Sequence, residues 1–211
     1  MKKIILLYLT LLNIAFAYNY DDVLLKAQAS IFPKIMLLDK KVEEKLIGGE
    51  IVYTIVYDKY DYDKALEVGK YINENYKGYF DKYRYKINFV DVLEFSGKTE
   101  ASAIYVLNVE KEIQKVADIA KKKGIISFSY DISNLKEGLM FSLVIEKSTV
   151  LYLKKENLQN KKVEFVDSLL QIVRFTEGDV IKNKVLLNND PEYNIRYAKT
   201  IIDILEDVSY N

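Results

Sequence analysis

The 211-residue chain contains no histidine, no cysteine, no tryptophan and only two prolines. Without histidine it cannot build His-dependent catalytic triads or two-histidine metal sites, and it lacks the side chain that titrates near neutral pH. Without cysteine it forms neither disulfides nor thiol redox centres. Its stability must therefore come from an apolar core, and hydrophobic residues make up 50% of the chain.

Residues 1–17 have the three-part layout of a secretory signal peptide. Lys2 and Lys3 precede an apolar run that ends at Phe16, and Ala15 and Ala17 form a small-residue cleavage motif. The run is shorter than the roughly 18 residues that a membrane-spanning helix needs. We therefore predict cleavage after Ala17, export of the chain, and no stable membrane insertion after cleavage.

The charge of the predicted mature chain is close to neutral. Residues 1–17 hold two of the 31 basic residues and none of the 31 acidic ones, so the remaining chain has a net charge of −2. Nucleic-acid binding usually shows as a basic excess on one face. We therefore expect no nucleic-acid partner.

The pattern of apolar residues alternates between helical spacing and short β-branched or aromatic runs. This alternation predicts parallel strands joined by right-handed crossovers, whereas the three residues between the last two strands permit only an antiparallel hairpin. The predicted fold is a three-layer α/β domain over 18–176, a mostly parallel sheet flanked by helices with an antiparallel hairpin at one edge. Residues 177–211 are predicted to form a C-terminal extension with an amphipathic helix. The predicted helices cover 21–42, about 64–77, 110–123, 163–174 and 190–205, and the predicted strands cover 50–57, 83–92, 102–107, 125–129, 139–145 and 149–153.

The loop after the first predicted strand is the best candidate for a small-molecule site. It follows the carboxyl end of a strand, where open α/β sheets bind ligands. Its carboxylates could ligate a hard cation, but the loop lacks the glycine and the closing glutamate of a calcium loop. Asp61 or Asp63 is better explained as the cap of the next helix. We therefore predict no metal and no cofactor, and name as candidate loop residues Tyr57, Asp58, Tyr60, Asp61, Tyr62 and Asp63.

Other motifs are weaker. Ser133 and Lys136 have the S-x-x-K spacing of some acyl-transfer enzymes, but no companion motif accompanies them, and a turn explains them better. Nine of the 18 tyrosines lie between Tyr53 and Tyr85, which suits an interface or ligand stacking. A chain rich in Lys, Asn, Ile and Tyr throughout also accounts for them. No set of residues forms a catalytic constellation, so we predict that the protein is not an enzyme.

Four short motifs between Lys26 and Phe175 resemble those of the YfiR-like (YfiR/HmsC) family of exported α/β proteins. A Lys-Ala pair opens the first helix, an Asp ends a strand, a glycine opens the hairpin, and a Ser-x-x-Leu-type pattern marks the last helix of the family. The chain departs from the family in lacking a Trp-Pro pair after the first helix and in having Lys154 where Asn is usual. The matching segments are Lys26-Ala27, Ser129-Tyr130-Asp131, Gly138-Leu139-Met140-Phe141 and Ser168-Leu169-Leu170 with Val173.

The resemblance implies a periplasmic regulator. Such a protein binds the periplasmic part of a membrane-bound diguanylate cyclase and represses it, which lowers cyclic di-GMP and biofilm formation. We expect an inner-membrane signalling protein of this kind, a diguanylate cyclase or a sensor kinase, as the partner. Repression of this kind needs only different affinities for two states of the partner. We expect the contact face at Phe32 and Pro33 of the first helix or at Ile201 and Leu205 of the C-terminal helix. A homodimer, and a periplasmic small-ligand-binding module that feeds a sensor or transport system, are the alternatives left open.

The single proline of the first predicted helix also affects its geometry. Pro33 removes one backbone hydrogen bond from that helix, so we expect a kink or a break near Phe32.

Overall fold

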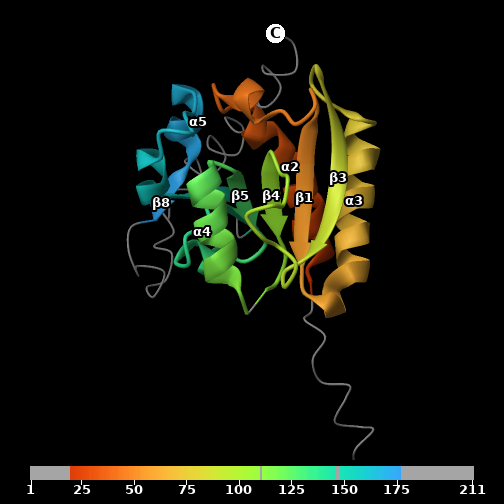
Figure 1. Ribbon diagram of the computed structural model, residues 1–211. Helices are drawn as coiled ribbons and strands as arrows, with labels where there is room; N and C mark the ends of the chain where they lie inside the picture. Colours follow the sequence, from red (N-terminus) through yellow and green to blue (C-terminus); the bar gives the residue numbers. More distant parts are fainter. Residues whose placement is uncertain (1–19, 110, 146–147, 177–211) are drawn as a thin grey trace, which may run out of the picture.

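The computed structural model describes residues 20–109, 111–145 and 148–176, and in this part of the chain eight strands form one sheet (Figure 1). The strands are β1 Ile51–Tyr57, β2 Tyr79–Phe80, β3 Tyr83–Asp91, β4 Ala103–Val106, β5 Ile126–Ser129, β6 Phe141–Ile145, β7 Thr149–Lys154 and β8 Arg174–Thr176. The helices are α2 Asp22–Leu37, α3 Tyr62–Tyr76, α4 Ile113–Lys123 and α5 Asp167–Ile172. Short 3₁₀ turns are η2 Val42–Lys45, η3 Lys59–Asp61, η4 Ile132–Leu135 and η5 Lys155–Gln159.

The strand order is β2-β3-β1-β4-β5-β6-β7-β8, and the neighbours from β3 to β6 are all parallel. β6 and β7 form the predicted antiparallel hairpin, with Leu143 opposite Leu151. These pairings confirm the predicted fold class. The hairpin does not end the sheet, because β8 pairs in parallel with β7 on its outer side. β2 and β8 are too short to show a periodic pattern, so the sequence analysis missed both.

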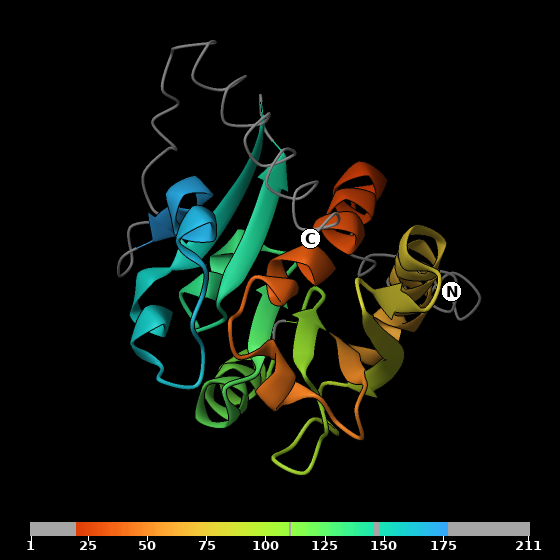
Figure 2. The same ribbon diagram turned by 90° about the horizontal axis from the view of Figure 1, so that it is seen from above.

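Helices cover both faces of the sheet and make two separate hydrophobic cores. α2, α3 and α5 pack on one face and α4 packs on the other, so the sheet lies between two helical layers (Figures 1 and 2). Along β1, Tyr53 and Ile55 point into the core on the α2, α3 and α5 side, and Val56 points into the core on the α4 side. This is the alternation of side chains that a strand requires. A strand buried on both faces needs a nearly continuous apolar run, and in β1 only Thr54, which is buried, interrupts it.

The first helix corrects two of the sequence predictions. α2 is capped by the Asp21 side chain, which accepts a hydrogen bond from the Leu24 N–H at 2.9 Å, and it runs through Pro33 without a break. Phe32 is fully buried, with its ring stacked on Phe128 at 4.5 Å, and Pro33 is buried as well. The expected exposed partner face at Phe32 and Pro33 is therefore wrong, because both residues are buried.

Several predictions fall outside the described residues. These are the signal peptide over 1–17 and the C-terminal extension over 177–211, with its proposed contact residues Ile201 and Leu205. Across the described ranges, no helix combines the length and the apolar character that crossing a bilayer would require. The predicted helix over 163–174 is shorter than expected, because Phe165 forms a β-bridge with Asp39 before α5 begins.

Candidate binding site at the carboxyl ends of β1 and β3

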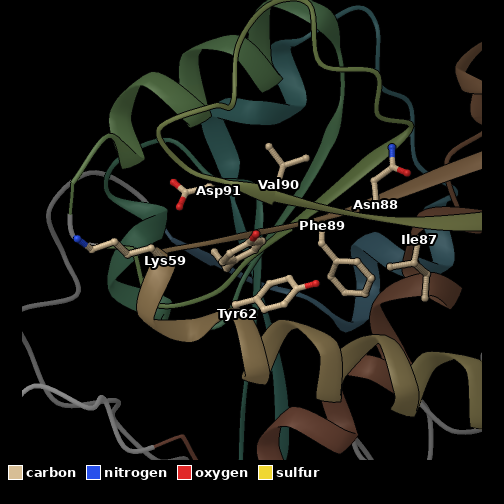
Figure 3. Close-up of a pocket in the computed structure, with 8 residues that line it drawn as sticks. Lys59, Tyr62, Ile87, Asn88, Phe89, Val90 and Asp91 are labelled. Atoms are coloured by element: carbon tan, nitrogen blue, oxygen red, sulfur yellow. The ribbon is translucent and has the colours of Figure 1, made fainter.

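An open groove of about 690 Å³ begins at the carboxyl ends of β1 and β3 and follows β3 back along the sheet (Figure 3). The parallel register places Tyr57 opposite Asp91, so the ends of both strands meet in the groove. The turn η3 and the first residue of α3 close one side of it. The groove is lined by Tyr57, Lys59, Tyr62, Ile87, Asn88, Phe89, Val90 and Asp91.

The residues of β3 line the groove from both sides of the strand. Ile87, Phe89 and Tyr62 lie on the α3 side of β3, and Asn88 and Val90 lie on the opposite side (Figure 3). Gly69 of α3 lets the Phe89 ring approach the helix, because a Cβ at this position would lie 2.7 Å from Phe89 Cζ. A glycine thus sets the depth of the groove on its α3 side.

Two tyrosine rings form the aromatic end of the groove. The Tyr57 and Tyr62 rings lie 5.3 Å apart with their planes tilted by 48°, a spacing typical of interacting aromatic pairs. Burial, and to a smaller extent the Asp91 carboxylate, raises the pKa of the Tyr57 hydroxyl above its ordinary value. Tyr57 therefore stays neutral at physiological pH and can donate or accept a hydrogen bond.

A lysine supplies the positive charge of this end of the groove. Lys59 lies in η3, and its Nζ is 4.6 Å from the centre of the Tyr60 ring. Hydrogen bonding with the Tyr60 side chain is the main reason why the pKa of the Lys59 ammonium is raised, and the charges of Asp58 and Asp91 add to it. Lys59 therefore remains charged up to alkaline pH and can meet an anionic group of a ligand.

The position where open α/β sheets usually bind ligands is filled by Tyr20. α3 leaves β1 over one face and α4 follows β4 over the other, so the crevice between β1 and β4 is the topological switch point. The Tyr20 hydroxyl donates to Asp61 Oδ2 at 2.7 Å and accepts from the Asn108 N–H at 2.9 Å. Its ring packs edge-on against Tyr130, with centroids 4.8 Å apart. We call this arrangement the Tyr20 latch.

Asp21 adds a second attachment beside the Tyr20 latch, and the surroundings of Tyr20 change the pKa of its hydroxyl. The Asp21 N–H donates to the Tyr130 hydroxyl at 2.8 Å, so two successive residues attach the chain to the carboxyl edge of the sheet. Burial foremost, and the bond to Asp61 second, raise the pKa of the Tyr20 hydroxyl far above its ordinary value. Tyr20 is 7% exposed, so its side chain, rather than solvent, occupies the switch point.

The candidate loop is only partly assembled into the site. Of its six residues, Tyr57 and Tyr62 line the groove, while Tyr60 is 78% exposed and lies outside it. Asp58 caps η3 by accepting from the Tyr60 N–H at 3.3 Å. Across the described residues, no group of three or more acidic side chains is placed to hold a metal ion.

The predicted capping role is correct in position and wrong in chemistry. Asp61 occupies the N-cap position of α3, but its carboxylate makes no capping bond because it accepts from Tyr20. Asp63 lies exposed in the first turn of α3, where its charge complements the helix dipole. Ser133 lies in η4 with Lys136 as its C-cap, so the S-x-x-K spacing here is a turn.

Sequence reasoning missed Tyr20, Lys59 and the β3 residues of the site. Tyr20 lies three residues after the end of the predicted signal peptide, where no periodic pattern marks it. Ile87 to Val90 appear as an ordinary buried strand, and only the strand order reveals that β3 lies near the edge of the sheet. A sequence shows which residues of a strand share one face, but it does not show where the strand lies in the sheet.

The comparisons with known proteins give the fold and no family. Neither a family model nor a curated protein matches the sequence. The fold is similar to that of a conserved domain protein from Vibrio cholerae O1 biovar El Tor, with a TM-score of 0.53 and 12% identity over 72% of this chain. The match spans 60% of that protein's length. A second structure, the ABC domain in complex with L-Trp from Streptococcus pneumoniae, has a TM-score of 0.45 and 11% identity over 69% of this chain and 62% of its own. The strand pairing and the similarity to the Vibrio cholerae structure agree on an α/β fold with a mixed, mostly parallel sheet.

Proposed function

We propose that this chain is an exported binding protein that regulates a membrane-bound signalling enzyme, a diguanylate cyclase or a sensor kinase, by direct contact. The observation that carries the proposal is the groove at Tyr57, Tyr62 and β3, which joins aromatic rings to charged and amide groups on an open edge of the sheet. The resemblance of the Lys26–Phe175 region to YfiR-like proteins supports this class of partner. Because Phe32 and Pro33 are buried, we place the proposed contact face at the groove instead.

The lining of the groove suits a protein segment as its ligand. Interfaces are enriched in tyrosine and phenylalanine, because these side chains bury a large area and lose little conformational entropy. Tyr62 is 44% exposed although it packs on Tyr57, so burial against a partner would remove a substantial apolar area from water. Lys59 and Asp91 provide charges of both signs at the rim of the groove, where they would favour one orientation of the partner.

Site-specific photo-crosslinking in the source cell tests this proposal. A benzophenone amino acid at Tyr62, on the groove, should give an adduct with an integral membrane protein whose cytoplasmic part carries a signalling domain. The matched control carries the same group at Lys115, which lies exposed on α4 and on the opposite face of the sheet. An adduct pattern identical at the two positions, or the absence of any membrane-protein adduct, would remove the support for regulation by contact.

A second candidate, a small-ligand-binding module, is favoured by the size of the groove. Its volume of about 690 Å³ lies within the range of about 300–1,000 Å³ that small-molecule sites occupy. A thermal-shift screen against nucleotides, amino acids and divalent ions should then find a compound that stabilises the chain and fails to stabilise a Tyr62→Ala variant. A flat response across the screen would leave the protein-partner proposal as the better one.

A further inference from the structure

The outer edge of β3 has backbone groups without a strand to pair with. β2 covers only the beginning of β3, where Tyr79 pairs with Arg84 and Phe80 with Tyr83. Beyond this point the described chain places no strand outside β3, although β3 continues to Asp91. Natural proteins usually cover or blunt such an edge, since it is a template for another strand.

The direction of each backbone group follows from two printed hydrogen bonds. The Val92 N–H donates to Tyr57 O, so even-numbered residues of β3 point their N–H and C=O toward β1. The Tyr85 N–H donates to Gly78 O on the opposite side, so odd-numbered residues point outward. In a parallel strand the two groups of one residue point the same way and alternate along the chain. Ile87 and Phe89 therefore direct both N–H and C=O outward, where no described residue bonds to them.

The side chains of this edge divide into an apolar face and a basic face. Ile87 and Phe89 face α3 and are half-buried against it. Arg84 and Lys86 lie exposed on the other face. Arg84 pairs with Tyr79 of β2 and lies over its ring, so Lys86 is the basic residue of the uncovered stretch. Lysine on a sheet edge discourages indiscriminate pairing, but the stretch from Ile87 to Val90 carries no charge, proline or bulge. The edge therefore excludes basic strands and remains available to acidic ones.

We propose that the β3 edge binds its partner by strand addition, and that the partner supplies an extended segment of alternating apolar and acidic residues. The apolar residues pack beside Ile87 and Phe89 toward α3, and an acidic residue faces Lys86, the basic residue of the uncovered stretch. Main-chain bonds to Ile87 and Phe89 provide affinity, and the two faces provide specificity. This inference rests on the proposed function and names the kind of segment that the groove takes.

A peptide experiment tests this mode of binding. The probe is a fluorescein-labelled, blocked octapeptide of alternating valine and glutamate, and its binding to the purified chain is followed by fluorescence anisotropy. We expect saturable binding that weakens with added salt, and none for the valine–lysine octapeptide or for a backbone N-methylated valine–glutamate octapeptide. Equal binding of the valine–lysine peptide, or of the N-methylated peptide, would overturn the proposal.

Two pairs of variants separate backbone pairing from side-chain contact. Ile87→Pro removes an outward N–H and breaks no bond to β1, and Ile87→Ala shortens the same side chain but keeps the N–H. We expect Ile87→Pro to bind about tenfold more weakly than Ile87→Ala, while circular dichroism shows both folded. Lys86→Glu should weaken binding of the valine–glutamate peptide by about three- to tenfold. Lys98 is also exposed and lies in the turn after Phe95, so Lys98→Glu should have no effect on binding. Equal affinities within either pair would contradict strand addition.

The outcomes also distinguish this inference from the proposed function. If Tyr62 crosslinks to a membrane protein while the peptide does not bind, the function stands and strand addition is wrong. If the peptide binds and no membrane-protein adduct forms, the edge pairs strands but the regulatory proposal fails. If sedimentation instead shows a dimer that Ile87→Pro dissociates, the occupant is a second copy of the chain, and the assignment to an acidic partner segment is wrong.

Discussion

Of two neighbouring positions at the carboxyl edge of the sheet, one is filled by a side chain of the protein and the other is open. Between β1 and β4 the Tyr20 latch fills the switch point, with hydrogen bonds to the loops that follow both strands. On the other side of β1, the groove beside β3 is open and lined by Tyr57, Tyr62 and Phe89. The fold places a crevice at the switch point, but a side chain of the same chain decides whether a ligand can enter it. In this protein the available site is displaced by one strand.

Removal of the latch is expected to give the largest change. Tyr20→Ala deletes a buried ring and leaves the Asn108 N–H without its partner, so the free energy of unfolding should fall by about 3 kcal/mol. Tyr20→Phe keeps the ring and loses only the hydroxyl, which should cost about 1–2 kcal/mol. Urea unfolding followed by circular dichroism measures both. Tyr60→Ala is the control, because Tyr60 is 78% exposed and its loss should change stability by less than about 0.5 kcal/mol.

The same variants test whether the two places are independent. Peptide binding at the β3 edge should be unchanged in Tyr20→Phe, because the latch and the groove lie on opposite sides of β1. A latch variant that is folded but no longer binds at the edge would show that the two places form one site, and the contrast drawn between them would be wrong.

A smaller effect is expected from the glycine that sets the depth of the groove. In Gly69→Ala, the new Cβ meets Phe89 Cζ at 2.7 Å, so the ring must move outward into the groove. The gain in helix propensity offsets part of the strain, and we expect a net loss of stability of about 1 kcal/mol together with weaker peptide binding. Gly97→Ala is a matched control, because nothing lies within 4 Å of a Cβ at that position. Unchanged binding in Gly69→Ala would indicate that Phe89 does not shape the groove.

The sequence was sufficient for the fold and insufficient for the site. Periodicity and the short hairpin connection predicted the layers and all six longer strands, because these signals are local. The site depends on non-local facts. Tyr20 fills the switch point only because the fold brings it beside Asp61 and Asn108. The outer edge of β3 is open to a partner strand only because β2 is short. Phe32 and Pro33 were predicted to form a partner face, but an unbroken α2 buries both, and which side of a helix meets the sheet is again a non-local fact.

The smallest expected effect on stability comes from the Asp61 carboxylate, which binds the Tyr20 hydroxyl. Asp61 lies in the loop beside the groove and accepts from Tyr20, and burial is the main cause that raises its pKa above the ordinary value of 3.8. A raised folded-state pKa means that the native state holds the proton more tightly. The stabilising contribution is therefore complete below the unfolded pKa and is lost as the pH rises through the folded pKa. Asp61→Asn keeps an oxygen that can accept from Tyr20 and does not titrate.

The stability of Asp61→Asn relative to the natural chain should therefore rise as the pH increases from the unfolded pKa through the raised folded pKa, by a few tenths of a kcal/mol after allowance for solvent screening of this half-buried group. Urea unfolding at several pH values measures the difference, and Asp63→Asn, which removes an exposed carboxylate from the next turn, should show no such rise. A stability difference that instead grows in favour of the natural chain would mean that the ionised carboxylate strengthens the latch. Tyr20 would then be held most firmly when Asp61 is charged, which is the opposite of the pH dependence expected from burial.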